Sequence, residues 1–322
     1  MTILSSPSVV LKSILVVLLF FYSVPILLGS FSPKVIRSTV FDKPVVDMGP
    51  SSIQSFKLNA SLFNRALFTR VYDLWFAEVP RGATGPPKEA LKRWFGFGSP
   101  ENRAVFDAEC SAGFKSALES IGPQRLSLPA FTTYEAERKN AHSIAAPFLT
   151  LDEVRNRTDE ERAETALGLV LLLDQLSRNI FRDNQSVVYG HYDRLSRALT
   201  HCILASPSQE NEASNPYAGA HVHPTFKASP PYRMWFYMPL MHSEDLTDHR
   251  TFEKLVGEMK ATHQGDEGAT HYVDQTLSVE KKHCEIIEKF GRYPYRNKVL
   301  SRETTSEERQ WVENGGDNFG TG

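Results

Sequence analysis

Charged and amide side chains interrupt the most apolar stretch found beyond the N-terminus of this chain, ETALGLVLLLDQLSRNIFR. Asp174, Arg178 and Arg182 are four residues apart and therefore form one stripe along a helix, with Gln175 and Asn179 in the adjacent stripe. Buried charges cost folding energy unless partners satisfy them. Because one Asp cannot neutralise two Arg, we expect other acidic residues or an anionic ligand to complement this stripe.

Two later segments carry the side chains that could complete a site. FYMPLMHSEDL contains His242 and Glu244, and FGRYPYRN contains Arg292, Arg296 and Asn297. The planar fork of an arginine binds phosphate or carboxylate through two parallel hydrogen bonds. A histidine with a carboxylate neighbour can act as a general acid or base. If the three segments converge, they predict a pocket for a small anionic ligand.

The same residues also have a structural interpretation, which the sequence leaves open. Helical proteins fasten loops to helices with buried Arg–Asp and Asn networks that carry no activity. The alternative hypothesis is therefore a non-catalytic helical scaffold that binds another protein in a groove between helices. Under the pocket hypothesis, the candidate catalytic residues are Asp174, His242 and Glu244, and the candidate ligand-binding residues are Gln175, Arg178, Asn179, Arg182, Arg292, Arg296 and Asn297.

Several other classes of site and partner are not expected. The net charge of −2 argues against nucleic acid as a partner, because phosphate binding requires a concentrated basic face. Neither a phosphate-binding loop nor a dinucleotide fingerprint is present, so no cofactor is predicted. No metal site is expected either, because His221 and His223 have no Cys or acidic partner at ligand spacing. Cys110, Cys202 and Cys284 are too far apart in sequence for a thiolate zinc site or a disulfide framework.

The elements that would position these residues are predicted to be helices. Apolar residues recur at three- and four-residue steps, and no segment shows strand alternation between hairpin turns. Thr158 with Glu161 and Thr305 with Glu308 have the spacing of capping boxes, and Gly291 is placed to end a long helix. We therefore predict an all-α fold, a compact bundle of antiparallel helix pairs.

The N-terminus predicts a membrane segment. No charge occurs between Lys12 and Lys34, and residues 13–33 are long enough to cross about 30 Å of hydrocarbon as a helix. A cleaved secretory signal is the alternative, but Pro33 directly follows the small-residue cleavage candidate. More basic residues follow the segment than precede it, which favours a cytosolic soluble domain in a single-pass membrane protein.

These patterns divide the chain into an anchor, a linker and one domain. Pro and Gly punctuate the stretch after the membrane segment, as in a tether. Two stretches without clear periodicity are predicted to be insertions in the domain. The expected parts are a flank at 1–12, a transmembrane segment at 13–33, a linker at 34–60, a helical domain at 61–313 with insertions near 123–150 and 205–231, and a flexible tail at 314–322.

The segments LLLDQLSRNIFR, FYMPLMHSEDL and FGRYPYRN, together with the earlier VYDLWFAE and RWF, closely resemble a bacterial and fungal family known as domain of unknown function 924. The segments occur in that family's order, and the resemblance covers Leu67 to Val312. It implies a compact all-α fold similar to tetratricopeptide-like proteins. It implies no activity, because the family has no assigned reaction. The chain departs from the family's pattern in its N-terminal segment and its two predicted insertions.

Overall fold

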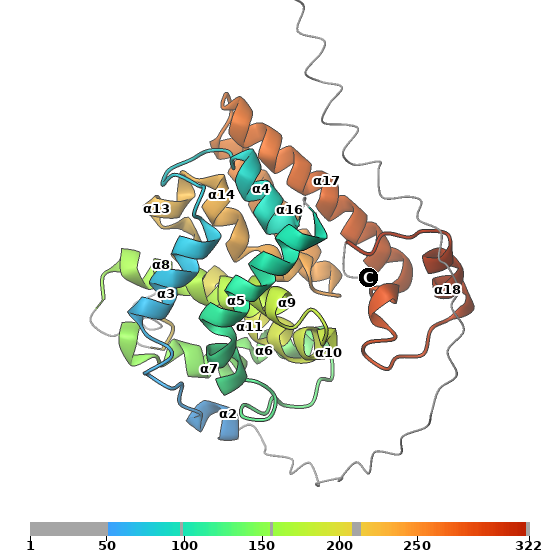
Figure 1. Ribbon diagram of the computed structural model, residues 1–322, viewed down its shortest axis with the longest axis horizontal. Coiled ribbons are helices and arrows are strands. Elements are labelled where there is room, and N and C mark those ends of the chain that lie inside the picture. The colour runs from blue at the N-terminus through green and yellow to red at the C-terminus, as the bar shows by residue number, and fades with distance from the viewer. Residues whose placement is uncertain (1–50, 97–98, 155–156, 208–213, 320–322) are drawn as a thin grey trace, which may run out of the picture. The chain divides into compact units, whose positions relative to one another are not determined.

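Helices provide all of the regular secondary structure in the part of the chain that the structure describes (Figure 1). The structure is a computed structural model that describes residues 51–96, 99–154, 157–207 and 214–319. These residues belong to one unit, Asp47–Gly322. No strand occurs within these ranges, and the predicted all-α class is confirmed.

The helices alternate between long regular elements and short turns. In chain order they are α2 (Ser51–Ser55), α3 (Arg65–Trp75), α4 (Lys88–Phe95), α5 (Pro100–Ser120), α6 (Tyr134–Lys139), α7 (Ala141–Leu149), η2 (Asp152–Val154), α8 (Asp159–Val170), η3 (Leu171–Leu176), α9 (Ser177–Ile180), α10 (Gln185–Val187), η4 (Val188–Tyr192), α11 (Asp193–Leu204), η5 (Ala220–Val222), α13 (Pro224–Lys227), α14 (Pro230–Arg233), η6 (Met234–Phe236), α15 (Met238–Met241), α16 (Leu246–Thr262), α17 (Glu267–Phe290), η7 (Pro294–Arg296) and α18 (Ser306–Glu313).

Local capping residues set the ends of several helices. Thr158 and Thr305 both form complete capping boxes, in which the side chain three residues later returns a bond to the cap. Gly291 ends α17 in the left-handed conformation at φ 68°, which glycine adopts without steric cost. These three predicted boundaries are confirmed.

α8, η3 and α9 follow one another without a break and form the central helix of the unit. The side chains of Leu171, Leu172 and Leu173 are fully buried. Helices α3, α5 and α11 pack against this central helix. α3 lies close to α8 at Gly168. A Cβ atom added to this glycine would lie only 3.2 Å from the ring of Phe68 on α3.

Two stretches differ from the predicted elements. The sequence predicts one bent helix at 232–246, but the structure has α14, η6 and α15 in succession. Pro239 lacks an N–H and prevents a continuous hydrogen-bond ladder there. The predicted insertion near 123–150 contains two helices, α6 and α7, and α7 packs against α11.

Within the ranges that the structure describes, no helix is long and apolar enough to cross a membrane. The predicted transmembrane segment at 13–33 lies outside those ranges, as does most of the predicted linker. In the predicted tail, the ring of Phe319 stacks on that of His283 with centroids 3.5 Å apart.

Candidate functional site

Asp174 lies in η3, a π-helical turn within the central helix. π-helical turns are rare and are frequent at functional sites, because the wider backbone turn redirects side chains. A second π-helical turn, η4, immediately precedes Asp193. His242 follows the end of α15, where Pro239 has already broken the helical ladder. Backbone irregularities therefore occur on the elements that present these three side chains.

The side chain of His242 is hydrogen-bonded to the carboxylate of Asp174. Nδ1 of His242 lies 2.9 Å from Oδ1 of Asp174, whose side chain is completely buried. Gln175 donates from Nε2 to the second carboxylate oxygen at 2.6 Å. An ionised carboxylate only accepts hydrogen bonds, so Nδ1 carries the proton of a neutral imidazole and Nε2 bears the lone pair. Nε2 has no hydrogen-bond partner among the described residues, and 16% of the His242 side chain is exposed.

A pair of guanidinium groups lies beside this dyad and shares one carboxylate. Arg178 donates from Nη1 to the backbone oxygen of Asp174 at 2.6 Å and from Nη2 to Asp193 at 3.0 Å. Nη1 of Arg296 lies 3.8 Å from the same Asp193. The Arg296 guanidinium also lies over the rings of Tyr189 and Tyr293, at 4.4 and 4.6 Å. Its Nε is buried and has no hydrogen-bond partner within the described part of the chain.

The local electrostatics favour an ionised Asp174 and a neutral His242. Burial alone would raise the pKa of Asp174, but the attraction of His242 and Arg178, with the hydrogen bonds from His242 and Gln175, outweighs burial and lowers that pKa. Burial lowers the pKa of His242, and the charge of Arg178 adds to this effect, although Asp174 opposes it. The result is an imidazole whose Nε2 can accept a proton near neutral pH.

Glu244 is close enough to Arg296 for that guanidinium to lower its pKa, but its carboxylate is bonded to other groups. Its Oε2 accepts from Arg302 at 2.6 Å and its Oε1 accepts from the same guanidinium at 2.9 Å. The backbone N–H of Tyr293 donates to Oε1 at 2.9 Å, and the hydroxyl of Tyr134 donates to Oε2 at 3.2 Å. Both oxygens are therefore occupied in an ion pair that joins the loop after α15 to the loop around η7.

Three of the remaining predicted residues, Asn179, Arg182 and Arg292, are paired elsewhere. Arg182 donates from Nε and Nη2 to Asp107 of α5 at 2.6 and 2.9 Å, and Asn179 donates to the same carboxylate at 2.8 Å. Arg292 forms a similar two-bond pair with Glu308 of α18, at 2.6 and 2.9 Å. Asn297 is fully buried in the turn after η7. These contacts fasten helices together and leave Arg292 and Arg182 away from the dyad.

The partners that complete these pairs lie outside the three sequence segments. The imbalance of one Asp against two Arg indicates that further acids must exist, but helical spacing does not identify them. Asp107 precedes the start of the central helix by 52 residues, whereas Asp193 follows that helix in the first turn of α11. Arg302 and Glu308 follow the last segment, outside its quoted motif.

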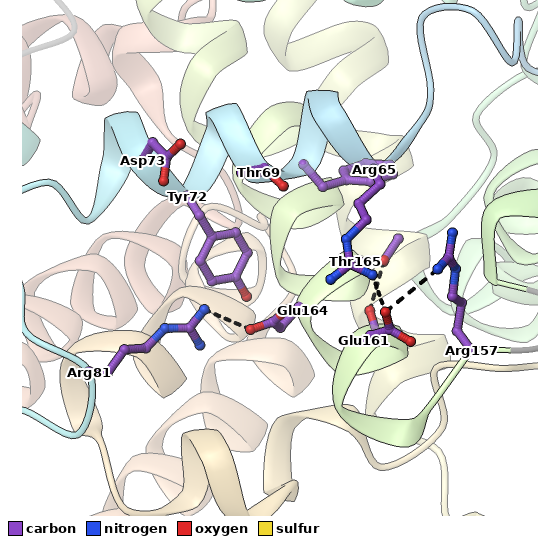
Figure 2. Close-up of a pocket in the computed structure, with 10 residues that line it drawn as sticks. Arg65, Thr69, Tyr72, Asp73, Arg81, Arg157, Glu161, Glu164 and Thr165 are labelled. Atoms are coloured by element: carbon purple, nitrogen blue, oxygen red, sulfur yellow. Dashed lines mark hydrogen bonds and ion pairs between the residues drawn. The ribbon is translucent and has the colours of Figure 1, made fainter.

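A separate cavity of about 120 Å³ lies between α3 and α8 (Figure 2). It is lined by charged and hydroxyl side chains, including Arg81, Glu164 and Tyr72. None of the predicted site residues lines it. The central helix therefore contributes to two polar regions, with Glu164 near its start and Asp174 in its π-helical turn.

Comparison with known proteins places the chain in a family. A solved protein of unknown function from Agrobacterium tumefaciens is similar, with 27% identity, a TM-score of 0.46, and coverage of 78% of this chain and 98% of that one. No curated protein matches the chain. The profile of a family described as "Bacterial protein of unknown function (DUF924)" matches residues 71–316. The chain belongs to this DUF924 family.

Proposed function

We propose that the Asp174–His242 dyad is a proton-transfer site for a small anionic molecule. The observation that carries this proposal is the partly exposed His242, whose Nδ1 is fixed by a buried carboxylate and whose Nε2 has no partner among the described residues. This arrangement holds an imidazole in one tautomer, as a general base requires. In this proposal Asp174 orients and polarises the ring, and His242 exchanges the proton.

Arg178 and Arg296 supply the affinity for an anion. Two guanidinium groups meet at Asp193, and the buried Nε of Arg296 is an unfilled donor. Buried donors in folded proteins nearly always have a hydrogen-bond partner, and a bound ligand or water can supply a missing one. An oxyanion at this position would accept a hydrogen bond from Nε.

Carbethoxylation by diethyl pyrocarbonate tests the proposal, because the reagent attacks unprotonated imidazole nitrogen. At pH 6.5 we expect peptide mass spectrometry to find rapid modification of His242. His249 is the matched control, because its two ring nitrogens bond Glu280 and the oxygen of Ser243 at 2.6 and 2.9 Å and its side chain is fully buried. Inorganic phosphate should slow the reaction of His242 in the wild type but not in Arg296→Lys, which loses the guanidinium fork.

A second function, that of a non-catalytic helical scaffold, is favoured by the closed ion pairs that the two later sequence segments form. Glu244 with Arg302 and Arg292 with Glu308 occupy residues that the pocket hypothesis assigns to a ligand. If His242 is as unreactive as His249 in the folded protein, the proton-transfer proposal fails and the scaffold is supported.

Attachment to a membrane through residues 13–33 is part of the proposal. The uncharged run between Lys12 and Lys34 supports it. The basic residues that follow favour a cytosolic domain. Alkaline carbonate extraction of cells producing the full chain is the test. We expect the protein to remain in the membrane pellet, and its release into the supernatant would overturn the anchor.

A further inference from the structure

The cavity between α3 and α8 is formed by one face of each helix. Arg65, Thr69 and Tyr72 are spaced four and three residues apart on α3, and Glu161 and Glu164 are three apart on α8. Such spacings place side chains on a common helix face. Figure 2 shows Tyr72 directed from α3 towards Glu164 on α8. The two faces therefore enclose a polar space, and the core leucines of the central helix are not part of it.

The hydroxyl of Tyr72 is a buried donor at this site. Tyr72 is 9% exposed, and its hydroxyl oxygen has no hydrogen-bond partner within the described ranges. Burial, reinforced by the charge of Glu164, raises the pKa of Tyr72 well above its ordinary value, so the group stays protonated. A buried hydroxyl without a partner is unfavourable, and a ligand oxygen that accepts a hydrogen bond from it would remove that penalty.

Arg81 lies next to this hydroxyl and uses only one of its N–H donors in a hydrogen bond to Glu164. Its Nη2 donates to Oε1 of Glu164 at 2.7 Å. The guanidinium lies over the rings of Tyr72 and Tyr232, with distances of 5.3 and 5.7 Å to their centroids. A guanidinium has five N–H donors, so most of its binding capacity remains available. Because 55% of the side chain is exposed, Arg81 can turn towards a molecule entering from solvent.

Three guanidinium groups and three carboxylates line the cavity, so anion binding there depends on the spare donors of Arg81 and not on an excess of positive charge. Arg65 and Arg157 both pair with Glu161, and Arg81 pairs with Glu164. The further acid that lines the cavity, Asp73, is exposed to solvent. A cavity of about 120 Å³ is well below the ~300 Å³ minimum of a drug-sized site. It suits a molecule of about eight non-hydrogen atoms, at roughly 15 Å³ for each water-sized group.

We propose that this cavity binds a short hydroxy- or oxo-carboxylic acid. Arg81 would grip the carboxylate with its planar fork, and Tyr72 would donate its hydroxyl proton to the hydroxyl or carbonyl oxygen of the ligand. A neutral amide of the same shape lacks the charge that Arg81 recognises. The site contains no residue of the Asp174–His242 dyad, and it is independent of the proton-transfer proposal.

Isothermal titration of the purified full-length chain with sodium L-lactate and sodium pyruvate tests this proposal, with lactamide as the neutral probe. We expect the acids to bind and lactamide not to bind. Tyr72→Phe should weaken acid binding about tenfold without lowering Tm, because the hydroxyl it removes has no partner. Arg81→Lys should weaken binding by a similar factor, because the ammonium cannot form the fork.

Matched substitutions separate a binding role from a structural one. Arg93 also pairs with two glutamates and lies over an aromatic ring. It lies outside the cavity, so Arg93→Lys should leave binding unchanged. Tyr192→Phe removes a hydroxyl that donates to Leu118 at 2.8 Å, and should lower Tm but keep binding. Arg296→Lys should also keep binding. Absence of binding at 10 mM acid, or equal affinity in Tyr72→Phe, overturns the proposal.

Discussion

The Nδ1 atom of His242 lies 2.9 Å from Oδ1 of Asp174, across sixty-eight residues of chain. The contact joins the loop after α15 to a π-helical turn of the central helix. The carboxylate is completely buried, whereas 16% of the imidazole side chain remains exposed. The carboxylate of Asp174 is therefore closed to solvent, whereas the imidazole of His242 is partly accessible. The protonation of His242 can be measured directly.

His242 should titrate below 6.5 in the folded protein, because burial and Arg178 both disfavour the imidazolium. Replacing Asp174 by Asn removes the carboxylate that opposes this shift, so the pKa of His242 should fall further. Two-dimensional NMR of the imidazole resonances across pH 4–8 gives both values. A wild-type pKa above 6.5, or a higher one in Asp174→Asn, would contradict this account.

The depressed pKa of His242 also makes a contribution to stability with a defined sign. The unfolded chain binds a proton at this histidine near pH 6.5, whereas the folded chain binds it only at lower pH. Stability from this group is therefore present above pH 6.5 and is lost as pH falls through the folded pKa. Urea unfolding at pH 7.5 and pH 5.0 is the measurement. The unfolding free energy of the wild type, relative to that of His242→Gln, should be smaller at pH 5.0 than at pH 7.5.

His249 should show the opposite pH dependence. Burial alone would lower its pKa, but the carboxylate of Glu280 outweighs burial and raises it. Stability from the His249–Glu280 pair is therefore fully present below pH 6.5 and is lost as pH rises through the folded pKa. The loss in unfolding free energy caused by His249→Gln should shrink between pH 6 and pH 8.5. A loss that grows across this range would show that His249 is neutral in the folded state.

The ion pairs formed by Glu244 and by Arg182 should contribute differently to the unfolding free energy. Glu244→Gln removes a carboxylate that is 4% exposed and accepts four hydrogen bonds, so we expect a loss of about 2 kcal/mol in unfolding free energy. Arg182→Gln breaks a pair with 39% exposure at the guanidinium, and should cost about 1 kcal/mol or less. Urea denaturation of both variants is the measurement. Equal losses would refute the ranking by burial.

Substituting two glycines within helices, Gly168 and Gly113, should change the stability of the domain in opposite directions. Gly168 faces Phe68 at the close approach of α3, so Gly168→Val should destabilise the domain by about 1–3 kcal/mol through overpacking. A Cβ atom at Gly113 in α5 would have no heavy atom within 4 Å. Gly113→Ala should therefore raise stability by about 0.5–1 kcal/mol, because alanine favours the helix. Thermal unfolding of the two variants checks both signs.

The sequence by itself determined the all-α class and where several of the helices begin and end. Capping depends on residues three positions apart, so Thr158, Thr305 and Gly291 carried that information locally. The long family segments likewise carried the family assignment. The broken helix around Pro239 was only partly foreseen, because the path of the chain after a lost hydrogen bond depends on packing.

Only the tertiary structure decided which charged groups meet. The spacing of Arg178 and Arg182 predicted a need for acidic partners, but did not identify Asp193, 15 residues from Arg178, or Asp107, 75 residues from Arg182, which lie on other helices. Hydrophobic packing of α5 and α11 on the central helix brings those acids into reach. Pairing between distant side chains follows from that packing, so local spacing could name the candidates but could not separate the partly exposed His242 from the sealed Glu244.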